Sequence, residues 1–489
     1  MSRPNQSMNH GRSGAQARWL LLLLFPVGYF ITLPYVDQYP LVHLAATCAS
    51  AFACCVLLLP LRQPLRSTLP LWLLFTVFMT YYAQLYWITA DSEALRGWWL
   101  PDLYSITNST SIRDAYVTIT IGFVTFAVTG GLLLANSADH ADGSRRAFQQ
   151  PDPARVFRTA FITLLIIAPT TGYAMYAGRI GLMGAEAPTL PFHLGGIVFY
   201  GRLATLPALL LLMIWSADTL HSKWRFNVAV AATLICGLSD MVLRASRGAL
   251  VSLLVPASLL LVLTDRLTRS RVVYLLLSVA MIVGLWPIMT LYRISRGTED
   301  PSILISLRQS LDAVTLTDVG NPAGVILDAG RTVLLRITGA VSLIPAVGAQ
   351  TKPLGIHGIA SVTDFFTTEV MGYPPEAIHS SAPSLLGWLF LVGGNVLVVV
   401  GVFGLTVGVW MVWRYVQASQ LSLAQVAQAL VATWLFYTVV DGVLERAYLS
   451  AFACALSVFL CEWIARSAGN KSRPGQVNAN LSPQVSPVR

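Results

Sequence analysis

Charged residues are scarce in this chain: Asp, Glu, Lys and Arg together make up 11% of its 489 residues. A soluble protein carries about a quarter of its residues charged. Hydrophobic residues are abundant instead, at 55% of the chain with a mean hydropathy of +0.64. This composition leaves no room for a large soluble domain and predicts an all-α, polytopic transmembrane protein.

The sequence motifs of soluble catalytic domains are also missing. There is no Walker phosphate-binding loop and no Gly-x-Gly-x-x-Gly after a strand, which excludes the common nucleotide-binding folds. All six cysteines lie in apolar segments without zinc or disulfide spacing, and the seven histidines show no metal-ligand spacing. We therefore expect neither a metal nor a cofactor.

The basic residues do not form a patch that would bind nucleic acid, although the net charge is +9. They are scattered between apolar segments, which is typical of residues that set membrane topology. Arginine outnumbers lysine 29 to 3, and a compositional bias of the genome explains most of that ratio. We expect no nucleic-acid partner.

Apolar windows of about 20 residues suffice to cross the hydrocarbon core of a bilayer. The sequence predicts about twelve spans, at 19–37, 41–60, 69–90, 114–136, 156–177, 195–216, 226–243, 249–264, 272–292, 385–413, 424–440 and 447–465. Of these, the eighth (249–264) is short, and the tenth (385–413) is long enough to tilt or break.

The charge distribution predicts the orientation of these spans. With the N-terminus in the cytoplasm, the inner segments hold 19 basic and six acidic residues, and the remainder holds 13 basic and 17 acidic residues. This asymmetry follows the positive-inside rule and places both termini in the cytoplasm. The basic N-terminal stretch lacks a small-x-small cleavage site, which favours a retained first helix over a signal peptide.

The chain therefore divides into five parts, of which one is a large hydrophilic outer loop. That loop contains two patterns typical of amphipathic helices, around 303–314 and 325–337. The parts are a cytoplasmic tail at 1–18, spans one to nine at 19–292, the outer loop at 293–384, spans ten to twelve at 385–465, and a disordered cytoplasmic tail at 466–489.

The pentapeptide Arg-x-Ser-Arg-Gly occurs twice, at 244–248 and at 293–297. The chain between the copies crosses and recrosses the membrane, so both copies emerge on the same, outer face. Arg244, Arg247, Arg293 and Arg296 thus lie on the side that basic residues avoid. Arginine grips phosphate oxygens with a planar fork of donors. These four arginines are candidates for binding a pyrophosphate, and lipid headgroups or nearby acids are their alternative partners.

Arg202 lies inside an apolar span. A charge near the middle of a membrane costs at least about 2.5–3.5 kcal/mol, so Arg202 needs a partner or a wet cavity. A structural ion pair and a contact with substrate pyrophosphate are equally good interpretations.

Three side chains are candidates for acid–base catalysis on the outer face. His379 and Glu376 lie just before the tenth span, and Asp240 lies one helical turn before the first pentapeptide. Each can accept a proton from an attacking hydroxyl. Solvated surface positions are the alternative for each. Because ATP and nucleotide sugars are absent outside, a substrate that reacts there must bring its own leaving group and arrive within the membrane.

Two short motifs carry a resemblance to a known family. Residues 246–250, Ser-Arg-Gly-Ala-Leu, open a helix, and residues 381–387, Ser-Ala-Pro-Ser-Leu-Leu-Gly, enter a glycine-rich helix. With the number of spans and the late outer loop, the chain resembles the bacterial O-antigen polymerase and ligase superfamily, in particular the Wzy-type polymerases of oligosaccharide repeat units. Many of those polymerases carry Gly-Glu where this chain has Gly387-Trp388, so the role of that acid is unassigned here or moves to Glu376.

The resemblance implies a GT-C-like glycosyltransferase in the bacterial inner membrane. It would join undecaprenyl-pyrophosphate-linked oligosaccharides on the periplasmic face, with membrane lipids and a chain-length regulator as further partners. The nearest alternative is an O-antigen ligase. An alternative of another class is a polysaccharide flippase or secondary transporter, for which we would expect pseudo-symmetric halves.

Overall fold

The computed structural model is described here for residues 18–61, 64–91, 108–136, 151–181, 194–244, 248–264, 271–273, 276, 280, 285, 292, 339–349, 353–373, 382–418, 423–442, 444 and 447–468. Within these residues the chain is all-helical, without a strand.

Eight of the described helices are long and apolar enough to span a membrane, and three shorter apolar helices accompany them. The protein is therefore a helical, membrane-embedded protein. The eight long helices and the three short ones correspond to eleven of the twelve predicted spans, and 272–292 lies mostly outside the described residues. The span helices are η1 (Arg18–Leu23) with α2 (Leu24–Thr32) and η2 (Leu33–Tyr35), α3 (Pro40–Leu58), α4 (Pro64–Val77) with η3 (Phe78–Ala83) and α5 (Gln84–Ala90), α7 (Ser109–Asn136), α8 (Pro153–Ala177), α9 (Leu194–Thr219), α10 (Lys223–Arg244), α11 (Gly248–Leu263), α17 (Leu385–Ala418), α18 (Ala424–Asp441) and α19 (Ala447–Ala468).

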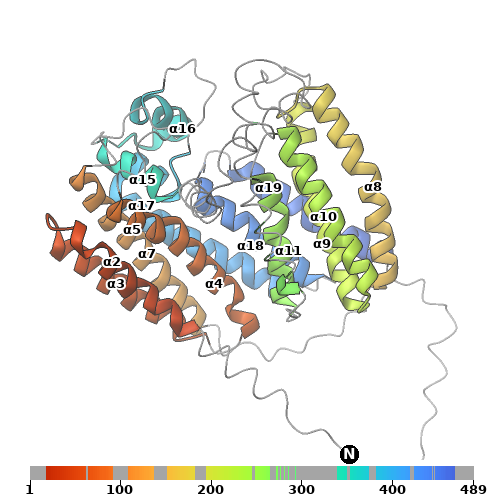
Figure 1. The fold of residues 1–489 in the computed structure, drawn as a ribbon, viewed down its shortest axis with the longest axis horizontal. Coiled ribbons are helices and arrows are strands. Elements are labelled where there is room, and N and C mark those ends of the chain that lie inside the picture. The colour runs from red at the N-terminus through yellow and green to blue at the C-terminus, as the bar shows by residue number, and fades with distance from the viewer. Residues whose placement is uncertain are drawn as a thin grey trace, which may run out of the picture.

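The helices pack into two groups, each around its own apolar core (Figure 1). The first helix group contains α2, α3, α5, α7 and the short helix α15 (Ala340–Gly348). The second helix group contains α8 to α11, α18 and α19. Helices α4 and α17 contribute side chains to both cores, so they join the two groups.

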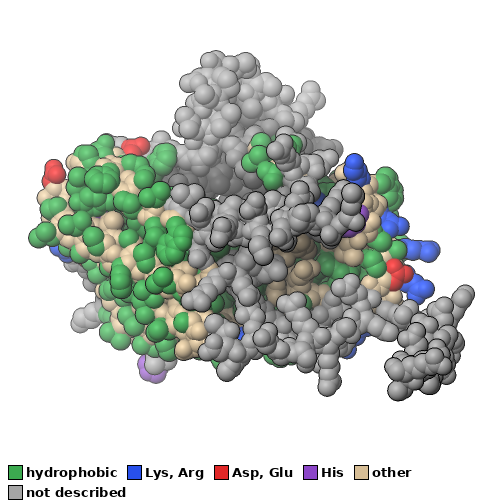
Figure 2. All heavy atoms as spheres, turned by 90° about the horizontal axis from the view of Figure 1, so that it is seen from below, with side chains coloured by type: hydrophobic (Ala, Val, Ile, Leu, Met, Phe, Trp, Pro, Cys, Tyr) green, Lys and Arg blue, Asp and Glu red, His purple; other side chains and the backbone are tan. Residues whose placement is uncertain are grey.

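Hydrophobic side chains cover much of the surface of the first helix group (Figure 2). In the same view, charged side chains gather at the edge of the molecule that is farthest from the first helix group, on the side where Figure 1 shows α8 to α10. Large apolar residues such as Phe52, Tyr173 and Phe452 are between 65% and 72% exposed. Because lipid replaces water around a membrane protein, such side chains are solvated there rather than exposed at a cost.

Helix α17 folds back on itself at Gly393 and Gly394, where the backbone leaves the helical region and Gly394 has φ of 63°. A Cβ added at Gly401 would lie 2.4 Å from Cδ2 of Leu389. In a continuous helix, 12 residues would separate those positions by about 18 Å along the axis. The expectation that this long span tilts or breaks is therefore confirmed as a break, and the segment 385–392 lies beside the helix that follows it.

The break in α17 frees carbonyl groups that a helix would otherwise use, and the preceding segment binds them. The backbone N–H of Leu354 donates to Leu391 O at 2.9 Å, and that of Gly355 donates to Val392 O at 2.9 Å. Buried polar backbone in a membrane must be satisfied in this way. The residues before α17 are thus part of the helix bundle.

Helix α15 is also part of the bundle, although the sequence analysis assigned its residues to the hydrophilic outer loop. Residues 340–347 are all buried, and α15 packs against α5, α7 and α17. Gly339 precedes it at a close approach, since a Cβ there would lie 2.0 Å from Thr80 O. The three short helices that follow are η7 (Ile356–Ser361), α16 (Val362–Phe365) and η8 (Phe366–Val370). The two predicted amphipathic helices of the outer loop lie outside the described residues.

Gly442 lets the end of α18 pack closely against the beginning of α17. It has φ of 61°, and a Cβ there would lie 2.0 Å from both Leu385 N and the carbonyl carbon of Ser384. Both contacts are with backbone, which has no rotamer to change. Only glycine fits this position.

We predict that Gly442→Ala lowers the free energy of unfolding by more than about 1 kcal/mol, because it combines a left-handed φ with a backbone clash. Thermal unfolding of the detergent-solubilised protein, followed by intrinsic fluorescence, measures the effect. Gly404→Ala is the matched control: a Cβ there meets nothing within 4 Å, so its melting temperature should not fall. Equal melting of the two variants would contradict the close approach.

Candidate functional site

Helices α9 and α10 bring two of the predicted site residues together, Arg202 and Asp240. The Nε of Arg202 donates to Asp240 Oδ1 at 2.8 Å, and its Nη2 donates to the same oxygen at 2.5 Å. Their side chains are only 4% and 9% exposed. Of the two interpretations of Arg202, the structural ion pair is the contact that the structure shows.

The rest of the Arg202 guanidinium is held by α8. Its Nη1 donates to Ala168 O at 2.6 Å and to the hydroxyl of Thr171 at 2.5 Å. Gly172 of α8 lies beside the same nitrogen, since a Cβ added there would be 3.5 Å from it. A charge inside an apolar helix is tolerated when its donors are satisfied, and here two neighbouring helices, α8 and α10, satisfy them.

Arg244, the last residue of α10, lies one turn beyond Asp240. Its guanidinium carbon is 4.8 Å from the ring centroid of Phe199, three residues before Arg202 on α9. Asp240, Arg202 and Tyr437 of α18 lie close enough to Arg244 to influence its charge. Because Arg202 and Asp240 neutralise each other, Arg244 contributes the net positive charge of this group, which suits an anion.

Tyr292, the residue before the second pentapeptide, contacts the end of α10. Its hydroxyl donates to Val242 O at 2.9 Å, and the residue is fully buried in a small cluster with Met241 and Ala249. Val242 lies two residues before the first pentapeptide, and the second begins directly after Tyr292. Helix α11 begins at Gly248, the last residue of the first copy. The residues that precede the two motifs, Val242 and Tyr292, are therefore in contact.

The structure thus gathers Arg202, Asp240 and Arg244 at neighbouring positions of α9 and α10. Five other predicted site residues lie outside the described residues: Arg247, Arg293, Arg296, Glu376 and His379. In the described part of the chain, no group of three or more His, Cys, Asp or Glu side chains is placed to hold a metal ion.

Three contributors to this site were not predicted from the sequence: Thr171, Phe199 and Tyr437. Thr171 and Phe199 have no sequence signal beyond their place in apolar helices. Tyr437 precedes Asp441 by one helical turn, near the last predicted outer segment, which is a weak signal for a position at the outer face. Asp240 is 6% exposed, so a hydroxyl must reach a nearly closed carboxylate, and its role as a base stays a prediction.

We predict that Arg202→Gln and Asp240→Asn each cost about 3–5 kcal/mol, because each leaves an uncompensated buried charge. The double variant should cost clearly less than the sum of the two. Unfolding titrations in mixed micelles measure all three free energies.

The exposed pair Arg113–Asp114, at 44% and 42% exposure, supplies the control for this cycle. Arg113→Gln should change stability by less than about 1 kcal/mol. Additive losses at Arg202 and Asp240, of the size seen at Arg113, would show that the pair is not buried.

Comparison of the chain with protein-family models, curated proteins and solved structures finds no match.

Proposed function

We propose that the chain is a membrane-embedded, GT-C-like glycosyltransferase that polymerises undecaprenyl-pyrophosphate-linked oligosaccharide repeat units into O-antigen or another surface polysaccharide. The reaction takes place on the periplasmic face of a bacterial inner membrane. The observation that carries the proposal is the contact between Tyr292 and Val242, beside the net positive charge of Arg244. It supports a cluster of arginines from both pentapeptides at one end of α10.

The chemistry needs little beyond binding and one proton transfer. A hydroxyl of one lipid-linked unit attacks the anomeric carbon of the other, and the bond from that carbon to the pyrophosphate oxygen breaks. The hydroxyl proton passes to a base, and the lipid pyrophosphate leaves with both electrons of the broken bond. Positioned guanidinium groups stabilise the charge that develops on the leaving group. No nucleotide is required, which agrees with the absence of a nucleotide-binding motif.

The contact at Gly442 supports His379 and Glu376 as candidates for the base. Gly442 packs on Ser384, and the five residues from 379 to 384 span at most about 18 Å. Gly442 lies five residues after Tyr437, the α18 residue that interacts with Arg244. One helix end thus links the chain that carries His379 to the guanidinium group of Arg244.

A reconstituted reaction tests the function. We expect the purified protein in lipid nanodiscs, given a lipid-linked single repeat unit and no nucleotide sugar, to produce a ladder of longer lipid-linked chains on a gel. Transfer only onto an added lipid A core would identify the ligase instead. Unchanged substrate after prolonged incubation would refute both.

The flippase or transporter is a second candidate, because α17 is discontinuous at Gly393 and Gly394. Interrupted helices mark substrate sites in many transporters. The same protein in sealed vesicles would then move lipid-linked oligosaccharide between leaflets without lengthening it. Arg244 is the last residue of α10, and its location at a helix end, rather than at the break in α17, favours the glycosyltransferase.

We predict that Arg247→Lys lowers the polymerisation rate by on the order of 10²–10³-fold, because lysine keeps the charge but loses the bidentate fork. Membrane insertion and melting temperature should stay unchanged. Arg113→Lys, at an exposed position of α7, is the matched control and should retain full activity. A normal chain-length distribution from the Arg247 variant would assign that residue to the lipid headgroups.

A further inference from the structure

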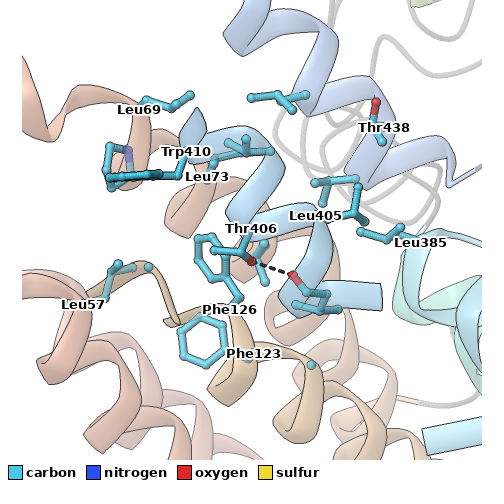
Figure 3. A pocket seen from close by; sticks show the side chains of 18 of the residues that line it. Leu57, Leu69, Leu73, Phe123, Phe126, Leu385, Leu405, Thr406, Trp410 and Thr438 are labelled. Atoms are coloured by element: carbon cyan, nitrogen blue, oxygen red, sulfur yellow. Dashed lines mark hydrogen bonds between the residues drawn. The ribbon is translucent and has the colours of Figure 1, made fainter. Parts of the chain in front are cut away.

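A cavity of about 120 Å³ lies between the two helix groups, bounded by α4, α7, α17 and α18. Leu73 of α4, Phe126 of α7 and Leu405 of α17 are among the side chains that surround it (Figure 3). Apolar cavities of this size stay dry but take up apolar ligands. Its occupant is therefore not water.

The few hydroxyl groups in the wall are engaged within the protein. Thr406 donates to Val402 O at 2.7 Å and Thr438 donates to Trp434 O at 3.1 Å. Tyr81 donates to Val439 O at 3.4 Å and accepts from the Leu386 N–H at 3.2 Å. Since hydrogen-bonding groups determine recognition of polar ligands, this wall is built for hydrocarbon rather than for a sugar or a phosphate.

The cavity is elongated along the helices. On α7 its wall runs from Gly122 to Leu134, which is about 18 Å at the rise of an α-helix. Two glycines in this wall let side chains of other helices approach α7 closely: a Cβ added at Gly122 would lie 2.8 Å from Leu386 Cδ2, and one at Gly130 would lie 3.1 Å from Leu57 Cδ1. This shape accommodates one extended chain rather than a compact ligand.

One end of the cavity lies next to the candidate site. Leu385, Thr438 and Val439 line that end, and Leu385 directly follows Ser384, on which Gly442 packs. The neighbouring residue Tyr437 lies close enough to Arg244 to influence its charge. The wall residue Thr438 and Tyr437 are thus adjacent on α18, which connects the apolar cavity to the surroundings of Arg244.

We propose that this cavity binds the isoprenoid chain of one lipid-linked substrate, with its pyrophosphate at Arg244; the proposal rests on the function proposed above. The surrounding helices span the membrane, so the chain enters from the bilayer without crossing water. The wall fixes the position of the lipid, and the guanidinium groups fix the position of the reacting phosphate.

Photo-crosslinking tests the proposal directly. The probe is a polyprenyl diphosphate with a diazirine on the tail, added to the full-length protein in nanodiscs. We expect adducts on peptides from α4, α7 and the 402–413 segment of α17, and loss of these adducts under excess unlabelled polyprenyl diphosphate. Adducts confined to the lipid-facing side of α8, or equal labelling of the cavity by a diazirine phospholipid, would overturn it.

A pair of variants on α17 provides the matched comparison. Val409→Trp fills the cavity that Val409 lines, whereas Val400→Trp adds the same volume at a position that is 58% exposed to lipid. We expect Val409→Trp alone to reduce competed crosslinking, and to raise the KM for lipid-linked substrate, by about tenfold. Unchanged crosslinking and KM in that variant would refute the proposal.

The two assays separate this proposal from the proposed function. Chain elongation without cavity adducts would refute the isoprenoid site and leave the polymerase standing. Competed adducts in the cavity without any elongation would refute the polymerase while showing that the protein binds a polyprenyl diphosphate there.

Discussion

A charge buried among apolar helices has to be neutralised, and Arg202 is the position where this constraint organises the protein. Its guanidinium binds Asp240 of α10 and two oxygens of α8, so three spans are held in register. Because α10 is held at Asp240, the position of Arg244 one turn later is also defined. Tyr292 packs against the same end of α10. A structural ion pair thus places the residues that we propose for substrate binding.

The second constraint is backbone contact where helices end or break. The break at Gly393 and Gly394 lets the first part of α17 fold back, and Gly442 lets the end of α18 reach Ser384. Helix α18 consequently lines the apolar cavity and also carries Tyr437, which lies close enough to Arg244 to influence its charge. The proposed lipid-linked substrate consists of a charged pyrophosphate followed by a hydrocarbon chain. The pyrophosphate matches Arg244, and the hydrocarbon chain matches the apolar cavity.

Hydropathy predicted the spans well, because the length of an apolar run is a direct measure of what can cross a bilayer. The window 249–264 corresponds to α11, and 424–440 to α18. Helix α15 was missed because nine apolar residues are too short to register as a span. The fold-back of α17 was expected only as a tilt or break, because two glycines barely change the hydropathy of a long run.

The site was predictable only in part, for a different reason. Arg202 stood out as a charge in an apolar segment, and its need for a partner follows from solvation alone. Which partner it takes, across 38 residues of sequence, depends on tertiary packing, as do the positions of Phe199 and Tyr437 beside Arg244.

The most direct test of the proposed function is whether both pentapeptides lie on one face of the membrane. With the native cysteines replaced, single cysteines at 247 and 296 should both react with an impermeant maleimide from the periplasmic side; reaction from opposite sides of the membrane would contradict it.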